Sequence, residues 1–283
     1  MPLVKKSGRI EIGCQGWNYA DWVTAPASGA SIFYPRSTRA QDMLEMYARA
    51  FETVEIDSTF YAVPSASTVE GWAARTPAGF TFALKLPQII THQLALRRGS
   101  AEVLAEFCER ARLLKEKLAC VLVQLPPQFE ATTDNFRALA EFISLLPSDV
   151  RFSVEFRDAA WFEASVLELL TRRRVSLALV EGQWVRRERV WRLIEQPSAD
   201  FAYVRWMGER DLTRFDVVAR PQDANLRAWS EVVERLSESC SPVYGYFSNF
   251  YEGHAPASAN KLKRILGQTV VDPHELENQP SLF

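Results

Sequence analysis

The feature that most constrains this chain is a repeated pair of patterns, a short β-rich run followed by a polar turn and a helical segment. Eight runs have strand character, at residues 9–13, 53–57, 80–86, 120–125, 151–157, 176–180, 201–206 and 243–247. Most runs are apolar at both odd and even positions, which is typical of parallel strands covered on both faces. The pattern therefore predicts an α/β protein with a parallel sheet.

Helical patterns fill most of the gaps between these runs. Apolar residues recur at helical spacing over residues 40–50, 68–75, 102–118, 135–146, 165–174, 224–237 and 257–266. The gap at 181–200 shows no clean helical period, which predicts a degenerate sixth crossover. This alternation predicts a single (β/α)8 TIM-like barrel over residues 1–267. The alternative is a doubly wound open sheet, although no Gly-x-Gly-x-x-Gly motif follows the first run.

Composition excludes several classes of protein. With 33 Lys and Arg against 35 Asp and Glu, the formal net charge is −2, so bulk charge cannot hold nucleic acid, although a local basic patch could. No apolar stretch approaches the roughly 18 residues of a transmembrane helix, and no signal core follows the first residues. The four cysteines lie far apart and indicate neither a disulfide framework nor a zinc site. We expect a cytoplasmic protein.

Polar and charged side chains stand at the ends of the predicted strands, where a barrel of this type places its site. They are Asp57, Lys85, Gln124, Glu155, Arg157, Arg205 and Asn249. Charged groups within apolar strands are costly unless paired, so the set indicates either a ligand site or an ion-pair network closing the barrel top. As a ligand site, Glu155 or Asp57 would act as general base. Lys85, Arg157 and Arg205 would stabilise negative charge.

Aromatic residues follow the same strands, among them Trp17 after the first and Tyr61 after the second. Stacking and cation–π contacts suit a planar or sugar-like ligand that carries anionic groups. We therefore predict that Trp17 and Tyr61 contact such a ligand. The alternative is that these side chains cover a hydrophobic core beneath long loops.

His254 precedes the last helical segment, within the string Gly253-His254-Ala255-Pro256. In barrels, the loops after strands seven and eight commonly form a phosphate site at a helix N-terminus. His254 is thus predicted to bind phosphate or to act as an acid or base, with packing against Tyr251 as the alternative. His92, after the third strand, is a second candidate.

Metal binding has little support in the sequence. The chain has three histidines, fewer than a zinc or di-metal barrel normally uses. We predict no cofactor beyond, at most, a single divalent ion held by Asp57, Glu155 and His254.

A set of ordered strings resembles one protein family. The strings are Gly13-Cys14-Gln15-Gly16-Trp17, Val54-Glu55-Ile56-Asp57-Ser58-Thr59-Phe60-Tyr61, Phe82-Ala83-Leu84-Lys85, Gln124-Leu125-Pro126-Pro127, Val154-Glu155-Phe156-Arg157, Tyr203-Val204-Arg205 and Tyr246-Phe247-Ser248-Asn249. Together they resemble the DUF72 (YecE-like) proteins over about residues 10–266. The resemblance implies a TIM-like barrel and names no reaction. Two positions depart from the family pattern, because Asp57 stands in place of Asn and Ser248 replaces the first of two Asn.

The residues after Gly267 show no helical or strand period, and 268–283 is predicted to be a flexible tail. It ends in Gln279-Pro280-Ser281-Leu282-Phe283. This string resembles the bacterial sliding-clamp-binding peptide, in which Gln279 would make polar contacts while Leu282 and Phe283 fill an apolar pocket. Ordering such a tail costs free energy, so the affinity should be modest. The alternative is that the tail packs on its own barrel or on a second subunit.

Three functions are consistent with these features. The first is a site for a small anionic, phosphate-bearing or nucleotide-like ligand, linked to DNA replication or repair through the tail. Tethering to a sliding clamp would let a slightly acidic protein act on nucleic acid. The second is a metabolic hydrolase or isomerase acting on a small sugar-like or phosphorylated molecule. The third is a non-catalytic ligand-binding module, and the sequence does not decide whether the protein is an enzyme.

Overall fold

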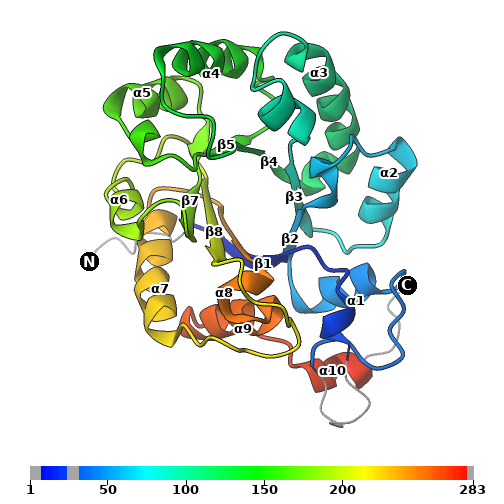
Figure 1. The fold of residues 1–283 in the computed structure, drawn as a ribbon. Coiled ribbons are helices and arrows are strands. Elements are labelled where there is room, and N and C mark those ends of the chain that lie inside the picture. The colour runs from blue at the N-terminus through cyan, green and yellow to red at the C-terminus, as the bar shows by residue number, and fades with distance from the viewer. Residues whose placement is uncertain (1–7, 24–31, 279–283) are drawn as a thin grey trace, which may run out of the picture.

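The strands form one parallel sheet that curls into a barrel (Figure 1). This computed structural model describes residues 8–23 and 32–278. The strands are β1 (Ile10–Gln15), β2 (Thr53–Ile56), β3 (Thr81–Lys85), β4 (Leu118–Gln124), β5 (Phe152–Glu155), β6 (Ser176–Leu177), β7 (Leu179–Gly182), β8 (Ala202–Gly208) and β9 (Val243–Phe247). Their order across the sheet is β6-β5-β4-β3-β2-β1-β9-β8-β7, so neighbours in the barrel are mostly neighbours in the chain.

One stretch of chain closes the barrel. β6 and β7 are separated only by Ala178 and correspond to the sixth predicted strand. β6 pairs with β5 while β7 pairs with β8, so the two ends of the sheet meet in this stretch. The N–H of Ala178 itself donates to the carbonyl of Val154 at 2.9 Å. The nine strand segments therefore occupy eight positions, and the predicted TIM-like barrel is confirmed.

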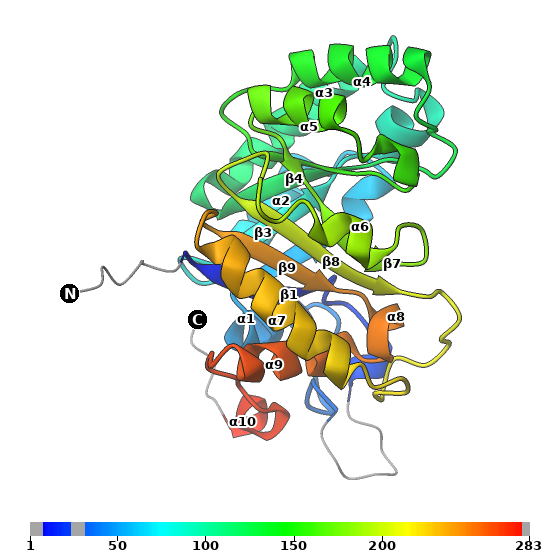
Figure 2. The ribbon, with the colours of Figure 1, turned by 90° about the vertical axis from the view of Figure 1, so that its left-hand side faces the viewer.

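Most helices surround the barrel on its outer face (Figure 1). They are α1 (Met43–Ala50), α2 (Ala66–Ala74), α3 (Ser100–Ala111), α4 (Thr133–Leu145), α5 (Ala164–Arg172), α6 (Arg187–Trp191), α7 (Asp223–Ser237), α8 (Asn249–Glu252), α9 (Ala255–Ile265) and α10 (Pro273–Asn278). α8 lies at the mouth of the barrel, and α10 packs on α1. Figure 2 shows α7 and α9 lying along one part of the sheet, where α9 contacts β1 and β9 and α7 contacts β9. The sixth crossover carries only the five-residue α6, as its irregular sequence predicts.

Helix starts follow from capping residues in the sequence. The Ser65 hydroxyl accepts a hydrogen bond from the N–H of Thr68 at 3.2 Å and caps α2. The Thr132 hydroxyl accepts from the N–H of Asn135 at 3.3 Å and caps α4. Each cap satisfies a backbone donor that the first helical turn leaves unpaired.

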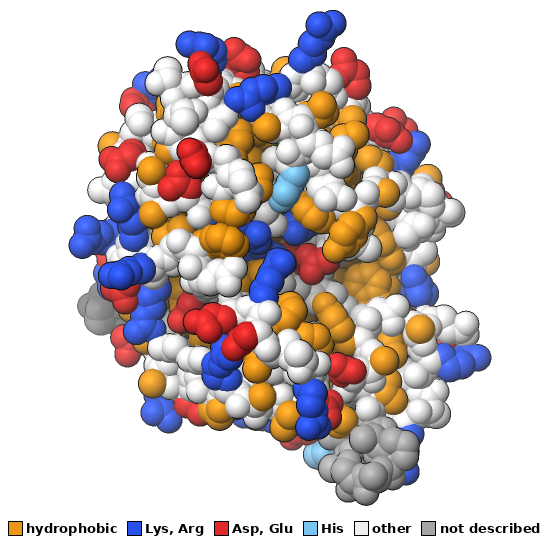
Figure 3. Space-filling view, in the orientation of Figure 1, with side chains coloured by type: hydrophobic (Ala, Val, Ile, Leu, Met, Phe, Trp, Pro, Cys, Tyr) orange, Lys and Arg blue, Asp and Glu red, His pale blue; other side chains and the backbone are white. Residues whose placement is uncertain are grey.

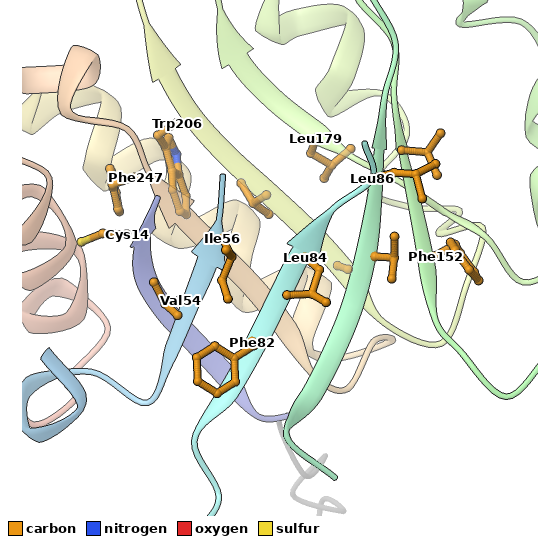
Figure 4. Packing of buried hydrophobic residues seen from close by; sticks show 14 of the residues in the cluster. Cys14, Val54, Ile56, Phe82, Leu84, Leu86, Phe152, Leu179, Trp206 and Phe247 are labelled. Atoms are coloured by element: carbon orange, nitrogen blue, oxygen red, sulfur yellow. The ribbon is translucent and has the colours of Figure 1, made fainter. Parts of the chain in front are cut away.

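Strand alternation divides the buried side chains into two layers. Outward-facing side chains such as Phe82 and Leu84 pack with Val54 and Ile56 between the sheet and the helices (Figure 4). The inner layer consists of Ala83, Ala119, Cys120, Leu122, Ala178, Phe201, Tyr203, Tyr244 and Tyr246. Because successive side chains point to opposite faces, residues two positions further along the strands also face the barrel axis. This alternation brings the charged residues at the strand ends into the barrel mouth.

The structure adds an element beyond Gly267. Gln268 donates from its amide to the carbonyl of Ile10 at 3.0 Å, and Arg264 pairs with Asp272 at 2.6 Å. α10 then contacts α1 and buries Leu276. The sequence period had predicted no element here. The clamp-motif residues Gln279, Leu282 and Phe283 lie outside the described residues. No helix in the described ranges has the length and apolar character needed to cross a membrane.

Candidate functional site

The carboxyl ends of the strands open into a cavity of about 380 Å³. Figure 3 shows a hollow at the centre of this face with both basic and acidic side chains in it. The lining residues are Gln15, Tyr19, Asp57, Phe60, Tyr61, Lys85, Gln88, His92, Gln124, Arg157, Arg205, Met207, Arg210, Phe215, Ser248, Asn249 and Phe250. They come from strand ends and from the loops that follow, which is where a barrel of this type carries its site.

A buried ion network forms the floor beneath the cavity. Arg205 is 1% exposed, and its guanidinium donates from Nε to Glu55 Oε2 at 2.9 Å and from Nη2 to Oε1 at 2.7 Å. Its Nη1 donates to Oε2 of Glu155. Tyr203 donates its hydroxyl to Glu55 Oε2 at 2.6 Å. One guanidinium therefore joins carboxylates from β2 and β5 to β8, across the interior of the barrel.

The network continues from Glu155 to the cavity wall. Arg157 donates from Nε to Glu155 Oε1 at 2.9 Å, so each oxygen of this carboxylate bonds to a different arginine. Burial alone raises the pKa of a carboxyl, but the charges of Arg205 and Arg157 outweigh it and lower the pKa of Glu155 to about 2. Glu155 does not line the cavity. This geometry favours a role in holding Arg157 over the proton transfer predicted from the sequence.

Lys85 has a different environment at the end of β3. Its side chain is buried, and its Nζ lies 3.8 Å from the centre of the Phe60 ring. Thr59 fixes the surrounding backbone, because its hydroxyl donates to the Lys85 carbonyl at 2.7 Å and accepts from the Lys85 N–H at 3.1 Å. Burial lowers the pKa of Lys85 to about 8, and the charge of Asp57 only partly opposes this effect.

Two further titratable groups line the same side of the cavity. Asp57 follows β2 and begins the short 3-10 turn η2 (Ser58–Phe60), and its Oδ1 is buried with no hydrogen-bond partner among the described residues. His92 lies in η3 (Ile89–Gln93), a π-helical turn of the kind that often occurs at functional sites. Burial, together with the charges of Lys85 and Arg157, lowers the pKa of His92 to about 4, so His92 is neutral at pH 7.

The loops after β8 and β9 complete the opposite wall. Asn249 accepts at Oδ1 from the indole N–H of Trp22 and from the backbone N–H of Ala255, both at 3.0 Å. Phe215 and Phe250 pack edge to face with their ring centres 5.1 Å apart. The two loops approach closely at Gly208, where a Cβ atom would lie 2.2 Å from the carbonyl oxygen of Phe250.

The cavity brings together most of the residues singled out in the sequence. Seven of the ten predicted catalytic and ligand-binding residues line it, namely Asp57, Tyr61, Lys85, Gln124, Arg157, Arg205 and Asn249. His92, the second histidine candidate, also lines it, as does Ser248. Asp57 and Ser248, the two positions that the sequence analysis expects to differ from the family pattern, both line this cavity.

Trp17 and His254 lie elsewhere. Trp17 turns from the cavity and packs edge to face on Trp72 of α2, with ring centres 6.2 Å apart. His254 caps α9 by accepting at Nδ1 from the N–H of Ala257 at 3.2 Å, and its ring packs edge to face on Trp22. Neither side chain lines the cavity.

Sequence reasoning missed several lining residues. Gln88, Met207, Arg210 and Phe215 belong to this group. Arg210 and Phe215 lie on the irregular segment after β8, where no period indicates which side chains turn inward. Met207 could have been found, because it continues the inward-facing series of Tyr203 and Arg205 along β8.

The suggested divalent ion at Asp57, Glu155 and His254 finds no support in the geometry. Across residues 8–23 and 32–278, no group of three or more His, Cys, Asp and Glu side chains is arranged to hold a metal ion. Glu155 is occupied by two arginines, and His254 caps a helix away from the cavity.

Comparisons with known proteins agree with this fold. The model of the family described as "Protein of unknown function DUF72" matches residues 11–281. The chain belongs to the DUF72 family. Among its relatives, the UPF0759 protein YunF of Bacillus subtilis (strain 168) is 26% identical over 282 residues, which cover 91% of this chain and 94% of YunF. The UPF0759 protein YecE of Escherichia coli (strain K12) is 31% identical over 153 residues, 54% of this chain and 50% of YecE.

Solved structures show the same architecture. The crystal structure of a DUF72 family protein from Thermotoga maritima MSB8 superposes with a TM-score of 0.75 and 23% sequence identity, covering 92% of this chain and all of that chain. The family resemblance of the sequence strings and the DUF72 barrel they imply are thus confirmed. At this identity the likeness concerns the fold, and the chemistry has to be argued from the cavity itself.

Proposed function

We propose that the cavity binds a small phosphate-bearing or nucleotide-like molecule. The charge of its wall carries the proposal. Lys85, Arg157, Arg205 and Arg210 line the cavity, and Asp57 is the one carboxylate among the described lining residues. Beneath the lining, Glu55 pairs with Arg205, and Glu155 pairs with both Arg205 and Arg157. Four cations against three carboxylates therefore leave an excess of one positive charge at the cavity. A concave wall with excess positive charge attracts and orients an anion.

The aromatic lining favours a ligand with a ring. Tyr19, Phe60, Tyr61, Phe215 and Phe250 surround the cavity. Tyr61 is 73% exposed, which is unusual for a large aromatic side chain and leaves its ring available for contact. Aromatic side chains stack on many kinds of ring. The lining therefore indicates a class of ligand rather than one compound.

Calorimetric titration with AMP, adenosine, ribose 5-phosphate and inorganic phosphate tests this proposal. We expect AMP to bind more tightly than adenosine, which lacks the anion, and than ribose 5-phosphate, which lacks the base. The variant Arg157→Gln should weaken AMP binding by roughly tenfold or more, the scale of a lost charge-assisted hydrogen bond. Arg112→Gln is the matched control, because Arg112 pairs with Asp149 on the surface at 2.7 Å. Equal affinity for AMP and adenosine would contradict the proposal.

Whether ligand binding leads to reaction is a separate question. The alternative of a metabolic hydrolase or isomerase needs a group that transfers protons, and Asp57 is the carboxylate in position for it. A non-catalytic module would need none. The variant Asp57→Asn separates the two, because an enzyme would lose turnover of its substrate while keeping affinity.

A link to DNA replication or repair rests on the terminal string 279–283 alone. We propose that this string docks on a bacterial sliding clamp and concentrates the barrel near DNA. The cavity and the terminal string are then independent modules, and each can be tested without the other.

A further inference from the structure

We propose that Lys85 captures a carbonyl group of the bound molecule as an imine. The cavity would then select phosphate esters that also carry an aldehyde or ketone. The phosphate part of this inference rests on the proposed function, whereas the imine rests on the surroundings of Lys85 alone.

The surroundings of Lys85 differ from those of the other buried lysines. Lys117 donates from Nζ to the carbonyls of Ala73 and Thr76, both at 2.7 Å. Lys263 pairs with Glu52 at 3.1 Å. Across the described residues, Lys85 Nζ has neither a hydrogen bond nor an ion pair, and its close neighbour is the face of the Phe60 ring. The Lys85 side chain is therefore largely buried, lines the cavity and is not engaged by an acceptor among the described residues.

Such an environment makes an amine nucleophilic at neutral pH. Only the neutral amine attacks a carbonyl, and desolvation by burial favours the neutral form. With the pKa of Lys85 lowered to about 8, about a tenth of the side chains are neutral at pH 7, against fewer than one in a thousand for an ordinary lysine.

The chemistry balances without an added reactant. The Lys85 nitrogen forms a bond to the carbonyl carbon, and the π electrons of the C=O bond move to oxygen, which takes up a proton to give a carbinolamine. The oxygen then leaves as water after a second protonation, while nitrogen loses its protons and forms the C=N bond. Asp57 lines the same cavity and is a carboxylate that can relay these protons. One water is released, and nothing is oxidised or reduced.

Pyridoxal 5′-phosphate is a suitable probe, because it combines an aldehyde, a ring and a phosphate. The wild-type protein is incubated with it, reduced with sodium cyanoborohydride to convert any imine into a stable secondary amine, and mapped by peptide mass spectrometry. We expect the adduct on Lys85 at a yield at least tenfold above that on Lys117 and Lys263, which serve as internal controls. The yield should rise with pH through about 8, following the free amine.

Two companion ligands separate the imine from anion binding. Pyridoxine 5′-phosphate carries an alcohol in place of the aldehyde, and pyridoxal lacks the phosphate. We expect the former to bind reversibly without an adduct, and the latter to label Lys85 at higher concentration. The variant Lys85→Arg has no primary amine and should lose the adduct.

The outcomes are distinguishable. Binding of pyridoxine 5′-phosphate with no preferential labelling of Lys85 overturns the imine and leaves the anion site standing. Labelling of Lys85 by both aldehydes, with no binding of pyridoxine 5′-phosphate, supports the imine and overturns the anion site. If neither occurs, both proposals fail. The labelling is read on wild-type protein, so the result does not depend on the folding of any variant.

Discussion

The buried ammonium group of Lys85 opposes folding, because burial disfavours its charged form. Its pKa in the folded protein is about 8, below the ordinary 10.5. The unfolded chain therefore binds more protons between these two values, so the contribution of Lys85 to stability rises with pH across that window. Below pH 8 the full unfavourable contribution is present.

We predict that Lys85→Met raises the free energy of unfolding by about 1–3 kcal/mol at pH 7, the scale of such a pKa shift. The gain should shrink towards zero as pH rises from 8 to 10.5. Urea unfolding at pH 7 and pH 10 measures both. Lys117→Met is the contrasting variant, since it leaves the carbonyls of Ala73 and Thr76 unpaired and should destabilise. A gain at Lys85 that does not change with pH would contradict the prediction.

Gly208 lies at the mouth of the cavity, at a position where a side chain does not fit. Its φ is +63°, and a Cβ there would meet the carbonyl oxygen of Phe250 at 2.2 Å. We predict that Gly208→Ala lowers the free energy of unfolding by roughly 1–3 kcal/mol and weakens ligand binding, because the loops after β8 and β9 must separate. Gly71→Ala is the control, since no atom lies within 4 Å of a Cβ inside α2. It should stabilise by about 0.5–1 kcal/mol, and thermal unfolding compares the two.

At the level of elements, alternation explains why so much of the site was predictable. Once 53–57 and 201–206 are read as strands of a barrel, Glu55 and Arg205 must face inward near their carboxyl ends. The same reasoning placed Lys85 and Gln124 in the cavity. The irregular sixth crossover was predictable from the missing helical period at residues 181–200, where the structure has only the five-residue α6.

Most of the residues that were wrongly placed or missed lie in loops, where neither the strand nor the helical period indicates which way a side chain points. Trp17 and His254 follow strand ends, yet local contacts turn one towards α2 and make the other the cap of α9. Arg210 reaches the cavity from an irregular segment whose path depends on tertiary packing. The sequence also did not show which of the three carboxylates is paired. Glu55 and Glu155 bond to Arg205, whereas Asp57 Oδ1 has no hydrogen-bond partner among the described residues, and this depends on the folded structure.

Across the whole molecule, the ion network couples the stability of the barrel to pH. The pKa of Glu155 is about 2 in the folded protein, below the ordinary 4.5. The stabilisation from Glu155 is therefore complete above pH 4.5 and is lost as pH falls through 2. We predict that Glu155→Gln lowers the free energy of unfolding by about 2–4 kcal/mol at pH 7 and that the difference from wild type shrinks towards pH 2.

Chemical unfolding between pH 2 and pH 7 checks this expectation. Glu168→Gln serves as the control, because that residue pairs with Arg172 on the surface and both side chains are largely exposed. Its effect should stay within a few tenths of a kcal/mol. A difference between Glu155→Gln and wild type that is the same at every pH would show that the carboxylate contributes packing rather than charge.

The remaining prediction concerns how the barrel is placed in the cell. Removal of residues 279–283 should abolish micromolar binding to a purified bacterial sliding clamp, measured by surface plasmon resonance. The double substitution Leu282→Ala and Phe283→Ala should do the same, because these side chains supply the apolar contact of such a peptide. AMP affinity at the cavity should be unchanged by either variant, since neither changes any of the described residues that line the cavity. If the intact and shortened proteins bind the clamp equally, or neither binds, the link to replication fails and the cavity alone carries the function.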